Sequence, residues 1–218
     1  MEREKVLIYY TCLTHDDVIE QLCRKQLLEA NLPIVSVSRN EPIDFGENHV
    51  ITGERSPETM HRQVLEGLKH ANAKYVFLCE SDVLYPPSHF DFIPEEEGVF
   101  YYDTNVWKYH TDMEKYTWTD DLQQVSGSAA YTKDYLRFYE RRVKEIEESG
   151  FDRHYEAGSK TGEIAMNWRG ADPMICIRHE NTITKTKKSP DDFINKSNAN
   201  GWTELYSIPK WDYLTNLL

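Results

Sequence analysis

The feature that most limits the fold of this chain is an apolar run that ends in acids. The run from Tyr75 to Glu80 is almost wholly apolar, whereas a strand with one solvated face would alternate polar and apolar residues. We therefore expect a strand that is buried on both faces. Pro86 and Pro87 follow soon after and stop the strand. In open α/β sheets, ligands gather at the carboxyl ends of such strands.

Glu80 and Asp82 lie one residue apart where this strand ends. Two carboxylates at such close range repel each other unless a cation balances them. A hard divalent ion fits this role, because its ligands are carboxylates, waters and phosphates. A lone acidic pair is more often a solvated strand end or a turn cap, but the buried strand before this pair favours a metal site.

The segments before this strand alternate between strand and helix patterns. Val6–Tyr10 and Pro33–Ser38 are expected strands, and the helix between them has an apolar face formed by Val18, Leu22, Cys23, Leu27 and Leu28. Residues 39–53 are interpreted as a long loop. Ser56 is a suitable helix N-cap and Pro57 suits the first helical position, so a second helix leads to the central strand. This order predicts parallel strands joined by right-handed crossovers.

The second half of the chain is less regular. Gly98–Tyr102 and Pro173–Ile177 are expected strands, and Lys133–Glu148 is an expected helix. The apolar stretch Ile164–Trp168 is interpreted as helical, with Glu163 at its start. The whole pattern predicts an α/β fold with a mixed, mainly parallel central sheet flanked by helices.

Charge, hydropathy and cysteine content indicate which partners and which cellular compartment to expect. The formal net charge is −12, which disfavours general attraction to polyanions such as duplex DNA. No apolar run approaches the roughly 20 residues of a membrane span. The cysteines are far apart and form no CxxC pair. We therefore expect reduced thiols and a cytoplasmic protein.

At the central strand the sequence resembles the GT-A-fold nucleotide-sugar glycosyltransferases, near the family-two-like group of small bacterial or phage enzymes. The matching residues are Gly67, Ala71, Tyr75, Leu78, Glu80 and Asp82. Glu80 stands where the family usually has the first Asp of its acidic motif. The resemblance spans about residues 5–180. It implies Mn²⁺ or Mg²⁺ as cofactor, with Asp82 as a direct ligand, Glu80 acting through water or on the ribose, and His179 completing the site.

The resemblance also implies roles for other residues, each of which has a simpler structural explanation. Glu163 would be the general base for the acceptor hydroxyl, with Glu156 and Asp172 as alternatives, although an acid at a helix start is also favoured by the helix dipole. Donor contacts would come from Tyr10, Thr11, Ser38, Arg39, Arg62, Gln63, Ser81, Arg178, Lys185 and Lys187. Acceptor contacts would come from Trp107, Tyr109, Gly127 and Ser128. The aromatic side chains among these are also natural core residues.

The resemblance predicts one catalytic domain, residues 1–180, with a nucleotide-binding half at 1–90 and an acceptor half at 91–180. Residues 181–218 would be a C-terminal tail that packs on the domain, with Trp202, Trp211, Tyr213 and Leu214 as anchors.

The expected activity is transfer of a sugar, with a UDP-sugar favoured as donor, to a hydroxyl acceptor. The acceptor could be a saccharide, a small molecule or, as a minority option, a modified base in phage DNA. Nucleotidyl transfer is the alternative enzyme class, but Tyr9–Thr14 lacks the Gly-rich basic loop usual after its first strand. A nucleotide-sugar-binding module without turnover is a third interpretation.

Overall fold

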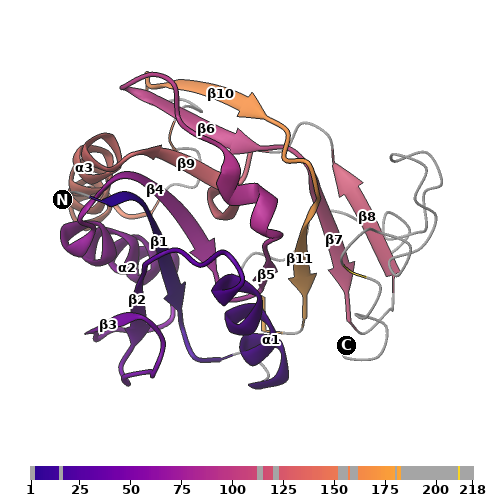
Figure 1. The fold of residues 1–218 in the computed structure, drawn as a ribbon. Helices are drawn as coiled ribbons and strands as arrows, with labels where there is room; N and C mark the ends of the chain where they lie inside the picture. The colour runs from indigo at the N-terminus through magenta and orange to yellow at the C-terminus, as the bar shows by residue number, and fades with distance from the viewer. Residues whose placement is uncertain are drawn as a thin grey trace.

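The computed structural model of the protein describes residues 3–14, 17–111, 115–119, 123–151, 157, 162–179, 181–182 and 211. Within this part of the chain, the strands form one seven-stranded sheet and one four-stranded sheet, which lie next to each other (Figure 1).

The first half of the chain builds the parallel part of the larger sheet. Its elements are β1 (Arg3–Thr11), α1 (Asp17–Leu28), β2 (Ile34–Arg39), β3 (Glu47–Ile51), α2 (Pro57–His70) and β4 (Ala73–Glu80). β1 pairs in parallel with β2 and β4, and β2 pairs in parallel with β3. The chain adds β2 and β3 on one side of β1 and then adds β4 on the other side. The strand order is therefore β3-β2-β1-β4, with its reversal between β1 and β4. In doubly wound sheets, the ligand crevice lies outside the carboxyl ends of the strands at such a reversal.

The second half completes this sheet. β9 (Ser128–Tyr131) pairs antiparallel with β4 and with β6 (Val99–Asp103), and β10 (Ile164–Trp168) pairs in parallel with β6. α3 (Thr132–Ser149) packs beside α2 on one face of the sheet (Figure 1). The expected fold class, a mixed and mainly parallel sheet flanked by helices, is confirmed.

The smaller sheet was not predicted from the sequence. Its strands, in spatial order, are β5 (Val83–Leu84), β11 (Met174–Arg178), β7 (Val106–His110) and β8 (Lys115–Thr119). Short 3₁₀ helices, η1 (Pro87–Asp91) and η2 (Val125–Gly127), lie in the connections. Because β5 follows β4 after only a turn, the smaller sheet begins where the central strand of the larger one ends.

The central strand and the second helix form as the sequence predicts. Tyr75 and the four residues after it are each no more than 4% exposed, so β4 is buried on both faces. Ser56 caps α2 by accepting a hydrogen bond at Oγ from the Thr59 backbone N–H, 3.1 Å away, and Pro57 opens the helix. A Cβ at Gly67 would lie 2.6 Å from Cγ2 of Ile8. Glycine therefore lets α2 pack directly on β1.

Two expectations about secondary structure are wrong. The expected loop 39–53 contains strand β3, which extends the sheet beyond β2. The stretch Ile164–Trp168 is strand β10, not a helix. It is only five residues long, and along it the exposed Ile164 and Met166 alternate with Ala165, which packs on the core. A period of two is the pattern of a strand.

The buried face of α1 also differs from the expectation. Ile19, Cys23 and Leu27 are buried, whereas Val18 and Leu28 are 54% and 60% exposed. The helix turns this face toward the turn after β4 and the smaller sheet. Tertiary contacts, rather than hydropathy alone, thus select which apolar residues of α1 are covered.

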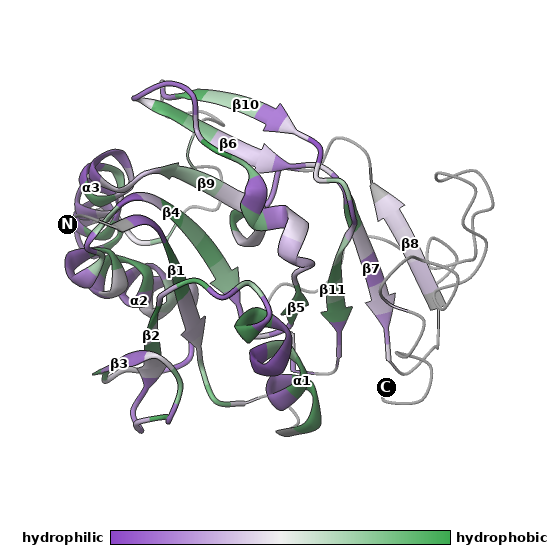
Figure 2. Ribbon diagram, viewed as in Figure 1, coloured by the Kyte–Doolittle hydropathy of each residue, from purple (hydrophilic) through white to green (hydrophobic). Residues whose placement is uncertain are grey.

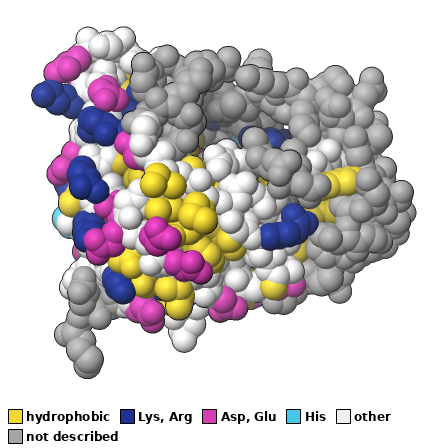
Figure 3. Space-filling model, turned by 90° about the horizontal axis from the view of Figure 1, so that it is seen from above, with side chains coloured by type: hydrophobic (Ala, Val, Ile, Leu, Met, Phe, Trp, Pro, Cys, Tyr) yellow, Lys and Arg dark blue, Asp and Glu magenta, His cyan; other side chains and the backbone are white. Residues whose placement is uncertain are grey.

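Strands β1, β4 and β11 are largely hydrophobic, whereas the three helices carry both hydrophilic and hydrophobic residues (Figure 2). Seen from above, hydrophobic side chains gather in the middle of the surface, with acidic and basic side chains nearby (Figure 3). The exposed Ile164 and Met166 of β10 lie on the edge of the larger sheet. None of the helices in the described residues combines the length and apolar character needed to cross a membrane.

Candidate functional site

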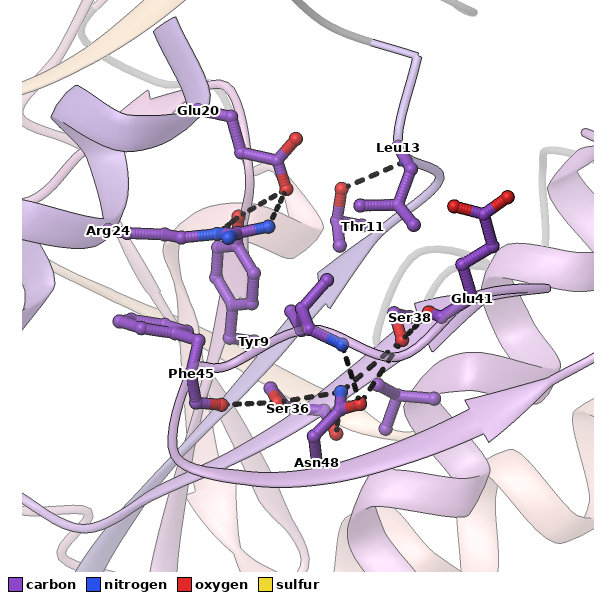
Figure 4. Close-up of polar contacts among 12 residues, drawn as sticks. Tyr9, Thr11, Leu13, Glu20, Arg24, Ser36, Ser38, Glu41, Phe45 and Asn48 are labelled. Carbon is purple, nitrogen blue, oxygen red and sulfur yellow. Dashed lines mark hydrogen bonds and ion pairs between the residues drawn. The ribbon is translucent and has the colours of Figure 1, made fainter. Parts of the chain in front are cut away.

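A cavity lies at the carboxyl ends of β1 and β2. Its volume is about 340 Å³, and its lining residues are Leu13, Glu20, Gln21, Arg24, Glu41, Pro42 and Ile43. They come from the loop after β1, from α1 and from the loop after β2 (Figure 4). The loops after β1 and β2 were expected at this edge, but the lining side chains on α1 were not among the predicted site residues.

The segment that connects β2 to β3 forms one wall of this cavity. Ser36 Oγ donates to the Phe45 carbonyl at 2.5 Å, and Ser38 Oγ donates to the Glu41 carbonyl at 2.6 Å. Asn48 Oδ1 accepts from the Ile43 backbone N–H at 3.0 Å. These bonds anchor loop 40–46 to β2 and β3 (Figure 4). Ser38 therefore shapes the cavity wall through its hydrogen bond.

An ion pair on α1 forms the opposite wall. Arg24 Nη2 lies 2.5 Å from Glu20 Oε1, and the Tyr9 hydroxyl donates to the same carboxylate oxygen at 3.2 Å (Figure 4). The guanidinium lies over the rings of Tyr9 and Phe45, at 5.9 and 5.8 Å from their centroids. Burial, and then the Glu20 carboxylate, raise the pKa of Tyr9 well above its usual value. Tyr9 therefore stays a neutral hydrogen-bond donor.

The structure brings Asp82 and His179, two of the predicted metal ligands, close together. Asp82 lies in the turn between β4 and β5, and His179 follows β11 of the other sheet. Asp82 Oδ2 and His179 Nε2 are 3.8 Å apart, with 15% and 6% of the side chains exposed. The Ile177 backbone N–H donates to the Asp82 carbonyl at 2.8 Å. The end of β11 is therefore tied directly to the acidic turn.

A buried tyrosine holds this turn from the other side. The Tyr85 hydroxyl accepts from the Glu80 backbone N–H at 2.9 Å and donates to the Ser126 carbonyl at 2.8 Å. Burial raises the pKa of Tyr85 well above its usual value, so the hydroxyl keeps its proton. A side chain in the core thus fixes the backbone at Glu80, where the acidic turn begins.

Glu80 has a different environment from Asp82. Its Oε1 accepts from the Tyr10 hydroxyl at 3.0 Å. Glu80 and Tyr10 are register partners on β4 and β1, on the sheet face that packs against α2 and α3. Burial, and then the Glu80 carboxylate, raise the pKa of Tyr10 well above its usual value. Tyr10 is therefore a buried support for Glu80 and does not line the cavity.

The cavity and the Asp82–His179 pair are neighbours across α1. Cys23, on the buried side of α1, is fully buried. Burial raises the pKa of its thiol well above the usual value, and the carboxylates of Asp82 and Glu20 add to the effect. The Cys23 thiol is therefore influenced by both Asp82, in the acidic turn, and Glu20, in the cavity wall. The thiol itself stays protonated and unreactive.

Several residues that were predicted to contact the sugar donor lie near the carboxyl ends of β1 and β2, but their side chains hydrogen-bond to the protein itself. The Gln63 amide donates to the carbonyls of Thr11 and Val37, at 2.7 and 3.0 Å, and joins the ends of β1 and β2. The Arg39 guanidinium donates to the carbonyls of Cys12 and Gly53. Arg62 is half-buried on α2, and Ser81 is buried in the acidic turn. Arg178 ends β11, whereas Lys185 and Lys187 lie outside the described residues.

Glu163 lies at the end of the sheet opposite to the cavity and Asp82. It directly precedes β10, and β10 runs parallel to β6, which in turn runs in the same direction as β4. The amino end of β10 is therefore opposite to the carboxyl ends of β1 and β4. Glu163 forms an ion pair with Arg141 of α3. Since the expected helix is also a strand, the reasons for regarding Glu163 as the general base no longer hold.

The predicted acceptor residues belong to the interior. Trp107 and Tyr109 are 1% and 7% exposed and pack in the core around the smaller sheet. Gly127 and Ser128 are buried as well. A Cβ on Gly127 would lie 2.7 Å from Cε of Met174, so this glycine makes room for a core side chain. These four residues do not line an open cleft.

One of the expected tail anchors is in place. Trp211 is fully buried against the smaller sheet, and its Nε1 donates to the Pro173 carbonyl at 2.8 Å. The other expected anchors, Trp202, Tyr213 and Leu214, lie outside the described residues.

No protein-family model matches the sequence. No curated protein matches it either.

Solved structures with a similar arrangement include three transferases. The 4-diphosphocytidyl-2C-methyl-D-erythritol synthase of Anaerococcus prevotii is 14% identical, with 78% of this chain and 90% of that chain covered and a TM-score of 0.48. The inositol-1-phosphate CTP transferase of T. maritima is 12% identical, with 83% and 91% covered and a TM-score of 0.47. The glycosyltransferase GlyE of Streptococcus pneumoniae is 9% identical, with 75% and 45% covered and a TM-score of 0.45. Similarities at this level assign neither a family nor an activity to this chain.

Proposed function

We propose that this protein is a metal-dependent glycosyltransferase that takes a nucleoside-diphosphate sugar as donor and a hydroxyl group as acceptor. The observation that carries the proposal is the approach of Asp82 and His179 outside the carboxyl end of β4, next to the strand-order reversal between β1 and β4. Ligand crevices in doubly wound sheets form at such a position. The acidic motif and its helix, which resemble those of GT-A enzymes, support the same assignment.

The side chains present fit Mn²⁺ or Mg²⁺. Asp82 offers a carboxylate, and His179 offers an imidazole that is compatible with Mn²⁺ as a further ligand. Asp82 Oδ2 and His179 Nε2 are 3.8 Å apart, which is too far for a hydrogen bond between these two atoms. Glu80 is oriented by Tyr10 and lies two residues before Asp82. Once bound, the metal ion would neutralise charge that develops on the departing nucleoside diphosphate.

The cavity beside α1 is the proposed place for the nucleoside. Leu13, Pro42 and Ile43 offer apolar contact area for a flat base. Glu41 offers a carboxylate that can accept hydrogen bonds from ribose hydroxyls. Arg24 is held by Glu20 and the aromatic rings, so its remaining donors are already oriented when a nucleotide arrives.

Nucleotidyl transfer differs from glycosyl transfer in the bond that breaks. A glycosyltransferase breaks the bond between the sugar and the diphosphate and releases a nucleoside diphosphate. A nucleotidyltransferase breaks the bond between the α- and β-phosphates of a nucleoside triphosphate and releases pyrophosphate. The two classes are therefore distinguished by their products.

The test begins with a thermal-shift screen of UDP-, GDP-, CMP- and dTDP-sugars, each with and without Mn²⁺. Release of nucleoside diphosphate is then measured with saccharide, small-molecule and hydroxylated-DNA acceptors. Release of pyrophosphate from nucleoside triphosphates is measured in parallel. We expect a Mn²⁺-dependent shift with one nucleotide sugar and release of the matching nucleoside diphosphate, or of CMP if the donor is a CMP-sugar. Pyrophosphate release alone would establish the nucleotidyl class, and a shift without any turnover would indicate a binding module.

A further inference from the structure

A second group of metal-binding side chains lies away from the candidate site. Glu47 and His49 are on strand β3, and His70 is the last residue of α2. A ring nitrogen of each histidine and a carboxylate oxygen of Glu47 all lie within 4.8 Å of one another. Residues of this stretch were expected to form a loop, so their convergence was not predicted.

The two imidazole rings are stacked, with centroids 3.6 Å apart and planes that differ by 15°. A metal ion lies in the plane of each imidazole that binds it, so one ring must turn about its χ2 bond for both to bind one ion. His49 Nε2 lies 3.2 Å from Glu47 Oε1, and His70 Nε2 lies 3.2 Å from Glu66 Oε1. Two ligands that each lie about 2.0–2.1 Å from a tetrahedral Zn²⁺ are themselves roughly 3.3 Å apart. The hydrogen-bonded spacing between His49 and Glu47 is therefore also compatible with two ligands on one ion.

The surroundings allow a cation to enter. The exposed fractions of the side chains are 61% for Glu47, 23% for His49 and 37% for His70, so water and ions reach the group. Glu66 Oε1 lies 3.2 Å from His70 Nε2, so Glu66 orients the His70 ring, as carboxylates do for metal-bound histidines.

The position of the group indicates what a bound ion would do. β3 is the last strand at its end of the larger sheet, and it pairs only with β2 among the described strands. His70 ends α2, and β4 begins at Ala73, so the group lies toward the amino ends of the strands. Asp82 lies beyond the carboxyl end of β4. An ion here would join the edge strand to α2 and would be remote from the proposed nucleotide.

We propose that Glu47, His49 and His70 bind one Zn²⁺ ion, with water completing the coordination, and that the ion fastens edge strand β3 to the end of α2. Two imidazoles and one carboxylate form a ligand set suited to Zn²⁺. This site does not depend on the proposed transferase activity.

The test uses the full-length chain after removal of metals with a chelator. The Asp82→Asn variant is the starting protein, because it removes a ligand of the other proposed metal site. Calorimetric titration with ZnCl₂ should show one saturable site, and a hundredfold excess over Kd should raise Tm by about 5–10 °C. Adding His49→Ala or His70→Ala should weaken binding at least tenfold and reduce the Tm increase at the same Zn²⁺ concentration to about half or less. The exposed Glu58→Gln, in the first turn of α2, is the matched control and should bind as the starting protein does.

Co²⁺ provides an independent readout, because its visible absorption reports the ligands around the ion. The spectrum should show nitrogen and oxygen ligation and should be lost in both histidine variants. Circular dichroism checks that those variants remain folded. The proposal is overturned if the starting protein shows no saturable site at micromolar Zn²⁺. It is also overturned if folded His49→Ala and His70→Ala proteins bind Zn²⁺ as tightly as the control.

Discussion

The carboxylate of Asp82 faces the imidazole of His179, with 3.8 Å between Oδ2 and Nε2, although the two residues follow strands of different sheets. Backbone contacts bring them together. Cys176 of β11 pairs with Val83 of β5, and the Ile177 N–H donates to the Asp82 carbonyl at 2.8 Å. The pair is therefore placed by the junction of the two sheets rather than by a flexible loop.

Asp82→Asn and His179→Ala should each weaken Mn²⁺ binding about 100-fold, because losing one charged or nitrogen ligand costs about 2–3 kcal/mol. Titration with Mn²⁺, followed by electron paramagnetic resonance, measures this directly. Asp91→Asn is a matched control, because Asp91 is an exposed acid in η1 and should leave the affinity unchanged. Wild-type affinity in both site variants would mean that the pair is only an ion pair between the sheets.

Tyr85→Phe should destabilise the fold by about 1–3 kcal/mol, because the Glu80 N–H and the Ser126 carbonyl lose their partner while the ring still packs. It should also weaken Mn²⁺ binding, since the turn that carries Asp82 is released. Urea denaturation and Mn²⁺ titration measure the two effects. Tyr101→Phe is the matched control, because the Tyr101 hydroxyl accepts from the Glu96 N–H at 3.0 Å, away from this turn. If the metal affinities of the two variants are equal, the hydroxyl of Tyr85 does not hold the site.

Arg24→Met should cost about 1–3 kcal/mol in the free energy of unfolding, because the Glu20 side chain, 8% exposed, loses its cation. Pairing it with Glu20→Gln in a double-mutant cycle should give a coupling above about 1 kcal/mol. Nucleotide affinity should fall about tenfold in Arg24→Met if the cavity holds the nucleoside. Lys25→Met, an exposed change on the same helix, should alter neither quantity.

Stability should decline as the pH falls from about 6.5 to 4 because of His61. Its ring is buried, and Nδ1 lies 2.8 Å from the Pro57 carbonyl. Burial, with a smaller contribution from Arg142, outweighs the Pro57 hydrogen bond and lowers the pKa of His61 from its usual 6.5 to about 4. The unfolded chain therefore takes up the proton first. The contribution of neutral His61 to the free energy of unfolding is complete above pH 6.5. As the pH falls toward 4, the free energy of unfolding decreases by up to about 3 kcal/mol.

Urea denaturation at pH 7.5 and pH 4.5 measures this decline. His61→Gln keeps a side chain that can donate to the Pro57 carbonyl but has no titrating ring. Its free energy of unfolding should therefore fall less between the two pH values than that of the wild type. Equal declines in both proteins would show that another group controls the acid response.

The parts of the fold that the sequence predicts well depend on local chemistry. The buried strand at Tyr75 follows from an unbroken apolar run, and the start of α2 follows from Ser56 and Pro57. The acids at the end of β4 follow from their position after that run. The place of His179 near Asp82 was expected only through resemblance to a known family, because no local pattern links the ends of two distant strands.

The sequence did not predict features that depend on long-range pairing. β3 lacks a strong apolar pattern because it is an edge strand, and β10 is too short for its periodicity to separate strand from helix. The cavity wall on α1 was missed because Glu20 and Arg24 look like ordinary charged residues of a helix. Only the packing of Tyr9 and Phe45 against Arg24 shows that this ion pair is partly enclosed.

By itself, the sequence determined β1, α1, β2, α2 and β4, but not β3, and it determined where the acidic motif lies, because these features depend on neighbouring residues. The tertiary structure decided which strand ends meet, which aromatic residues are core, and that Glu163 lies opposite to Asp82 across the sheet. The physical reason is that strand order and direction arise from hydrogen bonds between segments far apart in the chain, and local composition does not specify those partners.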